Sequence, residues 1–163
     1  MVTVTGGDRL REKLQGIARQ VTKASAVKVG FLAESTYPDG TPVAMIAAIQ
    51  NWGAPAAGIP PRPFFSNAVR AKKGEWPNAI RDLLKDNNYD ALRTLQQTGE
   101  VIAGQIRMSI IETNSPPLKP ATLRARGVAP GMKYNPANPA TFGAKPLVDT
   151  GVLLGSVNYE VKA

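Results

Sequence analysis

The chain has 163 residues, of which 43% are hydrophobic and 20% charged, as in an ordinary globular protein. Lys and Arg number 20 against 12 Asp and Glu, and the resulting net charge of +8 is compatible with DNA or an acidic protein as a partner. The absence of Cys and His excludes disulfides, thiolate chemistry and the commonest general base and metal ligand.

The length fits one domain, residues 1–163. We expect it to comprise an N-terminal helix (8–24), a strand–helix core (26–113), an extended Pro-rich loop (114–146) and a C-terminal helix and strand (147–163). No apolar run approaches the roughly 18 residues that cross a bilayer, and no secretory signal is visible. We therefore expect no membrane partner.

The N-terminal helix is predicted from four apolar residues at steps of four, three and four: Leu10, Leu14, Ile17 and Val21. Asp8 is a suitable N-cap residue. The remaining faces are mostly Arg, Lys and Gln, so the helix should lie on a surface with its apolar side covered.

Residues 26–33 alternate apolar and other side chains, which predicts a strand. Thr41 followed by Pro42 predicts the start of a helix, and Gly53 its end. Because this helix is apolar nearly all round, we expect it to be buried against the sheet or another subunit.

A further helix is predicted from Phe64, and Pro77 should interrupt it by removing a backbone donor. The longest predicted helix spans 89–112. Gly99 falls on its apolar stripe, where glycine costs about 1 kcal/mol relative to alanine. A glycine there predicts that another backbone approaches closely.

Residues 114–146 hold seven of the 14 prolines and should form the long loop, with one short helical turn. Such a stretch is commonly functional or ordered by a partner. Asp149 is expected to cap a short helix before a last strand. The predicted fold is α+β, with a small mixed or antiparallel sheet that includes 26–33 and 156–162, covered by four or five helices.

No pair of acids shares an apolar helix face, and no phosphate-binding motif is present; "GVAPGMK" is only a loose echo of one. We expect no catalytic residue, no cofactor and no metal. The protein should not be an enzyme.

Five basic residues lie in the Pro-rich loop: Lys119, Arg124, Arg126, Lys133 and Lys145. They could line up along phosphates without reading base sequence. The alternative is a solvated loop that packs on a neighbouring protein, and the scarcity of aromatic residues for base stacking favours it.

The stretch "NWGAPAAGIPPRPFF" supplies a candidate interface: Trp52, Pro61, Arg62, Pro63, Phe64 and Phe65. Adjacent side chains on a helix diverge by about 100°, so one phenylalanine should face outside the subunit. Arg62 is placed to reach an acid or backbone carbonyls of a partner. The alternative is that this stretch fills the chain's own core. We expect Arg62→Ala or Phe65→Ser to leave a folded monomer that does not assemble.

Four motifs occur in one order: "VAMIAAIQNWGA" with "IPPRPFFSNAV", "LQQTGEVIAGQIRMSI", "PPLKPATLRARG" and "KPLVDTGVLLGSVNYEV". Together they resemble the signatures of small tailed-phage neck and tail-completion proteins of the HK97 gp10-like and phage Mu virion-morphogenesis families. The likeness covers roughly residues 41–161. Asn51 stands where the family pattern usually has an acid.

The resemblance implies a structural virion protein that forms a homo-oligomeric ring, a hexamer by the tail's symmetry, in the neck between head connector and tail tube. Its partners would be the connector or adaptor, the tail terminator or tube, and the DNA in the channel. It would be made in the host cytoplasm and reside in the virion. The alternatives are a tail terminator that caps the tube and a nonspecific DNA-binding module.

Overall fold

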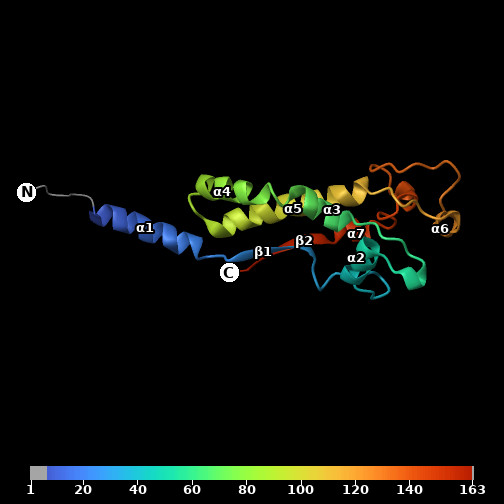
Figure 1. The fold of residues 1–163 in the computed structure, drawn as a ribbon, viewed down its shortest axis with the longest axis horizontal. Helices are drawn as coiled ribbons and strands as arrows, with labels where there is room; N and C mark the ends of the chain where they lie inside the picture. The colour runs from blue at the N-terminus through green and yellow to red at the C-terminus, as the bar shows by residue number, and fades with distance from the viewer. Residues whose placement is uncertain (1–6, 163) are drawn as a thin grey trace, which may run out of the picture.

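A two-stranded antiparallel sheet lies against one long helix in the computed structural model, which describes residues 7–162 (Figure 1). Strand β1 (Ala26–Phe31) pairs with β2 (Val157–Lys162), so an early and a late segment of the chain meet in the sheet. Both strands pack on α5 (Ala91–Glu112). The predicted α+β fold is confirmed, and its sheet is antiparallel.

The remaining elements are mostly helical. In the sequence, β1 is preceded by α1 (Gly7–Val21). Three helices follow β1 before the chain reaches α5: α2 (Val43–Trp52), α3 (Phe64–Lys72) and α4 (Trp76–Asp86). Short α-helices and 3₁₀ helices complete the chain: η1 (Pro55–Ala57), α6 (Pro120–Ala125), η2 (Pro139–Ala144) and α7 (Val152–Gly155). The described residues therefore contain seven α-helices. The five longer ones agree with the four or five predicted, and α6 and α7 lie where a short helical turn and a short helix were predicted.

The hydrophobic core lies where α2, α3 and α7 meet α5 and the sheet. Its members come from segments far apart in the sequence: Val43, Ala47, Phe64, Ile102, Ile106, Ile110, Leu147, Val148, Leu153 and Val157. Phe64, Val43 and Ile110 have no exposed surface at all. Burial of these side chains holds the C-terminal segment and α2 against the same apolar surface of α5.

Gly99 allows the sheet to approach α5. A Cβ built on Gly99 would lie 2.6 Å from two ring carbons of Tyr159 on β2, closer than atoms can pack. A close approach at this glycine is thus present, but the prediction that another backbone makes it is wrong: the nearest atoms belong to the Tyr159 side chain.

The apolar side of α1 is uncovered along its N-terminal half, contrary to the prediction, whereas Ile17 is half-buried. Leu10 and Leu14 are 59% and 54% exposed. In Figure 1 the helix extends along the long axis beyond the N-terminal end of α5. The periodicity predicted the helix correctly but carried no information on what covers it.

Helix α2 is buried on one side only within this chain. Val43, Ala47 and Asn51 are buried, whereas Met45 is 49% and Trp52 70% exposed. The uncovered face of α2 is therefore apolar surface available to another protein.

Three predicted helix caps are wrong. Asp8 lies inside the first turn of α1, after Gly7. The residue before α2 is Pro42, with no side-chain cap, and Thr41 instead donates its backbone N–H to Asp39 Oδ1 at 2.9 Å. Gly151, in a left-handed conformation, is the residue that directly precedes α7. Asp149 pairs with Arg126 at 3.2 Å.

The Pro-rich loop, residues 114–146, lies at the opposite end of the molecule from α1 (Figure 1). It contains α6, where a helical turn was predicted, and η2, which was not. Tyr134 and Phe142 pack together with ring centroids 5.7 Å apart. The loop is thus folded onto itself rather than structureless.

Candidate functional site

The predicted interface residues divide between the surface and the interior. Trp52 is exposed, and Pro61 also faces outward, whereas Arg62 and Phe64 are 5% and 0% exposed. We call residues 52–65 the hinge segment, because they join α2 to α3. Its two ends have different roles: the Trp52 end offers apolar surface, and the Arg62–Phe64 end is part of the core.

Arg62 holds three segments together. Its Nε donates to the carbonyl of Pro116 at 2.9 Å, one terminal nitrogen donates to Gln50 Oε1 at 3.1 Å, and the other donates to the Pro117 carbonyl at 3.4 Å. Burial, and secondarily the charge of Arg126, lowers the pKa of Arg62. The expectation that Arg62 extends to a partner is corrected: the carbonyls that it reaches belong to its own chain.

The two adjacent phenylalanines diverge as predicted, but neither faces fully outside the subunit, because Phe65 is partly buried against the core. Phe64 points into the core, and its ring meets Phe31 edge to face with centroids 6.1 Å apart. Phe65 is half-buried and lies against Gly30 of β1. Pro63, between Arg62 and the first helical residue, is also half-buried.

Beside Phe65 there is an apolar hollow of about 190 Å³ between β1 and α2, bordered by Phe31, Ala48, Trp52 and Phe65. Trp52 stands at its rim with most of its surface exposed. An apolar hollow next to an exposed indole is the kind of surface that a protein partner covers.

Asn51 caps α3, a role that the sequence did not reveal. Its Oδ1 accepts the backbone N–H groups of Phe65 and Ser66, both at 3.1 Å, and its Nδ2 donates to Ser66 Oγ at 2.8 Å. The side chain is 3% exposed. The first turn of α3 has no acid and no cap of its own, so a residue from α2 supplies the acceptor that free N–H groups at a helix start require.

We expect Asn51→Asp to keep the free energy of unfolding within about 1 kcal/mol of the parent at pH 7, because a carboxylate accepts the same two N–H groups at a helix N-terminus. Asn51→Leu should lower it by about 1–3 kcal/mol, because it leaves buried donors unpaired. Urea unfolding measures both variants.

The carboxyl introduced by Asn51→Asp should have a lowered pKa in the folded chain, so its contribution to the free energy of unfolding should disappear as the pH falls through that pKa. Equal losses for both variants at pH 7 would contradict the capping role.

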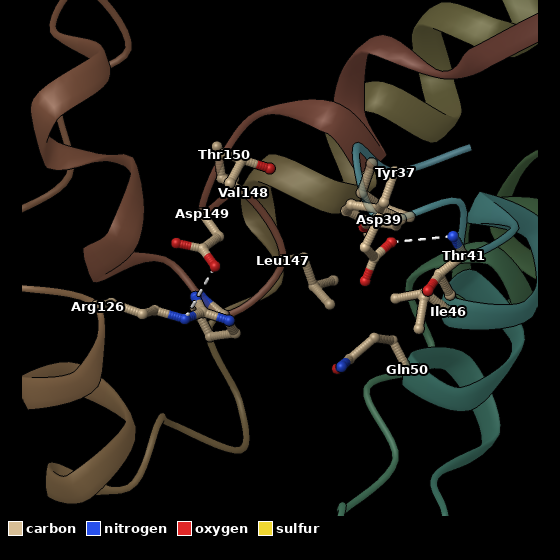
Figure 2. Close-up of a pocket in the computed structure, with 12 residues that line it drawn as sticks. Tyr37, Asp39, Thr41, Ile46, Gln50, Arg126, Leu147, Val148, Asp149 and Thr150 are labelled. Atoms are coloured by element: carbon tan, nitrogen blue, oxygen red, sulfur yellow. Dashed lines mark hydrogen bonds and ion pairs between the residues drawn. The ribbon is translucent and has the colours of Figure 1, made fainter. Parts of the chain in front are cut away.

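A cleft of about 300 Å³ lies between the segment that precedes α2 and the segment that precedes α7. Figure 2 shows Asp149 and Arg126 on one side, Asp39 and Thr41 on the other, and Leu147 between them. The sequence singled out Arg126 and Asp149 only separately. Their pairing depends on how the Pro-rich loop folds back toward α7, for which the sequence gives no signal.

The surroundings shift the pKa values of two ionisable groups in the cleft. Burial, with Asp149 as the next cause, raises the pKa of Tyr37. The Thr41 N–H lowers the pKa of Asp39. Within residues 7–162 no three His, Cys, Asp or Glu side chains form a group that could hold a metal. The cleft offers hydrogen-bonding groups and one ion pair around apolar side chains.

The five basic residues of the Pro-rich loop do not form one surface. Arg126 is tied to Asp149 and to the Lys145 carbonyl, and Lys145 Nζ donates to the Ile111 carbonyl and Asn114 Oδ1. The other three cations are exposed: Lys119, Arg124 and Lys133. The expectation of five cations facing a partner or DNA is corrected to these three.

None of the helices in the described part of the chain is both long and apolar enough to span a bilayer. Comparison of the whole chain with protein-family models, with curated proteins and with solved structures finds no match.

Proposed function

We propose that this chain is a structural subunit of the neck of a tailed bacteriophage, a tail-completion or head–tail joining protein that assembles into a ring. The ring is expected to be a hexamer between the head connector and the tail tube, and the subunit is expected to carry no catalytic centre. It would reach the virion from the host cytoplasm during assembly.

The observation that carries the proposal is that residues from separate motifs contact one another. Gly99 of the second motif accommodates Tyr159 of the fourth. Arg62 of the first motif donates to the Pro117 carbonyl of the third. Positions that the family pattern specifies therefore meet as packing and hydrogen-bonding partners, as expected if the pattern encodes one fold.

The position of Asn51 adds to this support. The family pattern usually has an acid there, and the site that Asn51 occupies needs an oxygen that accepts two N–H groups at the start of α3. An acid and an amide both satisfy that requirement. The departure from the pattern thus leaves the local interaction intact.

Uncovered apolar side chains support self-assembly. Leu10 and Leu14 on α1, Met45 and Trp52 on α2, and Val101 and Met108 on α5 are each about half exposed or more. They lie on different elements, as a ring requires, because in a ring one patch on each copy meets a different patch on the next.

Native mass spectrometry of the purified full chain tests the ring, and a closed oligomer, a hexamer, is expected. In particles of a phage that encodes the chain, peptides from it should be present at ring stoichiometry, and cryo-electron microscopy should place the density between connector and tube. A strict monomer that is absent from the particles would overturn the proposal. Density that only caps the tube would assign the chain as a tail terminator.

Salt dependence separates the ring from a DNA-binding module. A nonspecific DNA binder should lose affinity steeply between about 50 and 200 mM salt, because its contacts release counterions from phosphates. A ring held by apolar contacts should persist over this range. Loss of all assembly at the higher salt concentration would contradict the apolar contacts proposed for the ring.

A further inference from the structure

The apolar stripe of α1 has no cover along its N-terminal half. Leu10 and Leu14 are 59% and 54% exposed, and Val21, at the far end of the stripe, is 39% exposed. In Figure 1 this half of the helix extends away from the rest of the molecule. A projecting helix with a regular apolar stripe is suited to insertion between helices of another protein.

The charges beside the stripe have one sign. At 100° per residue, Arg11 flanks it on one side and Arg9 and Lys13 on the other, whereas Asp8 and Glu12 lie on the opposite face. A matching surface should therefore be an apolar line or groove with acids at its margins.

The groove between α3 and α5, which we call the α3–α5 groove, fits this description. It has a volume of about 550 Å³. Small residues line its floor (Ala68, Ala71 and Gly104), and Val101 and Met108 project beside them, 56% and 53% exposed. Small residues allow the backbone of another helix to approach closely.

The spacing and charge of the groove match those of α1. Four residues follow the exposed side of α5 at steps of four, three and four, as on α1: Val101, Gln105, Met108 and Glu112. Glu112 lies at one end of this line, and Glu100, whose side chain is 62% exposed and 3.5 Å from Arg107, precedes the other end. Lys72 also lines the groove and is paired with Glu75. With Leu10 placed beside Val101, Glu100 lies near Arg9 of the basic flanks of α1, and Glu112 lies beside Val21 at the other end of the stripe.

A chain cannot fill its own groove with its own α1. The helix connects directly to β1 and runs off beyond the N-terminal end of α5, away from the groove (Figure 1). We propose that α1 of one copy binds in the α3–α5 groove of a second copy.

The direction of binding connects this contact to the ring. In Figure 1, α1 and α5 run the same way along the molecule. Neighbouring copies in a hexameric ring differ by a sixth of a turn, so a bound α1 would run roughly parallel to the neighbour's α5. In a two-fold dimer the two helices would run antiparallel. The contact itself does not rest on the proposed function, but its direction decides whether it builds the proposed ring.

Sedimentation velocity and native mass spectrometry of full-length variants test the contact. Leu14→Glu and Gly104→Phe should each weaken self-association at least about tenfold, as expected when a central apolar anchor is lost or its pocket filled. Gly16→Phe is the matched control, since Gly16 lies off the stripe and a Cβ on either glycine meets no atom within 4 Å. Because Leu14 and Gly104 lie at the surface, circular dichroism and the melting temperature of both monomers should stay near the parent's.

Cross-linking between separately purified single-cysteine variants identifies the surfaces and the direction, because the parent has no cysteine. Parallel binding predicts disulfides between Leu10→Cys and Val101→Cys and between Ile17→Cys and Met108→Cys. Antiparallel binding predicts Leu10→Cys with Met108→Cys and Ile17→Cys with Val101→Cys. Intact masses distinguish these mixed products from cross-links between identical variants.

Either mixed pattern supports the contact, and the antiparallel one would at the same time contradict the ring. Unchanged self-association in Leu14→Glu and Gly104→Phe would overturn the contact, as would equal weakening by Gly16→Phe. Cross-links that form only between two Leu10→Cys chains would also overturn it. The same holds if the parent stays monomeric while α1 binds vesicles containing anionic lipid. A ring that persists with α1 unbound would overturn the contact and leave the neck assignment standing.

Discussion

Replacing Phe64 by alanine is expected to lower the free energy of unfolding by about 3–5 kcal/mol, the usual cost of removing a fully buried aromatic side chain. Phe64 has no exposed surface, and its ring packs edge to face on Phe31. Phe64 belongs to the buried core cluster, so its removal should leave a cavity that adds to the loss. Urea unfolding followed by circular dichroism measures the loss.

The adjacent residue provides the control. Phe65→Ala removes the same atoms from a half-buried position next to the hollow between β1 and α2. We expect a loss of about 1–2 kcal/mol, in proportion to the smaller apolar area that this ring buries, together with weaker self-association if the hollow is covered in the ring. Equal destabilisation by the two substitutions would contradict the division between an inward and an outward phenylalanine.

This pair shows what local sequence could predict. Helix geometry alone requires neighbouring side chains to diverge, so the sequence predicted that one ring would face inward and the other not. It did not say which. That choice depends on Phe31 and Ile106, which reach the same place from distant segments of the chain.

Element positions were predicted well where a short period or a breaking residue marks them. The strand before Phe31, the end of α2 at Gly53, and the start of α4 next to Pro77 follow from alternation, glycine and proline. The caps at Thr41 and Asp149 were predicted wrongly, because both residue types cap helices elsewhere and tertiary contacts gave these two other neighbours.

Surfaces were the least predictable part of the molecule. The spacing of Leu10 and Leu14 defines an apolar stripe, but whether a stripe is covered depends on where the chain turns next. α1 leads into β1 in such a direction that its stripe is left free. The same limit applies to Trp52. The sequence predicted either an exposed interface residue or a residue of the chain's own core, and could not choose between them.

Substitution of Arg62 is the second change for which we expect a large loss of stability, and it tests a role that the sequence did not predict. Arg62→Met keeps the volume of the side chain but leaves two backbone carbonyls and Gln50 Oε1 without their donor. We expect the free energy of unfolding to fall by about 2–4 kcal/mol, because unpaired, partly buried acceptors and lost charge-assisted hydrogen bonds are costly. The sequence could not reveal this role, since the acceptors at Pro116 and Pro117 lie 54 and 55 residues away.

Arg62→Lys is the matched control. A single ammonium group cannot span the planar fork of acceptors that a guanidinium reaches, so an intermediate loss is expected. Hydrogen exchange should locate the effect: amides in residues 113–119 should exchange faster in Arg62→Met, while those of the β1–β2 pair keep their protection. If Arg62→Met instead unfolds at the parent's urea concentration and is deficient only in self-association, then the arginine acts on a neighbouring copy, and the internal role derived from its burial is wrong. Because the buried guanidinium fixes the Pro-rich loop to the hinge segment, any ring contact made by that loop should weaken in proportion to the loss of stability, which sets Arg62 apart from surface positions such as Leu14.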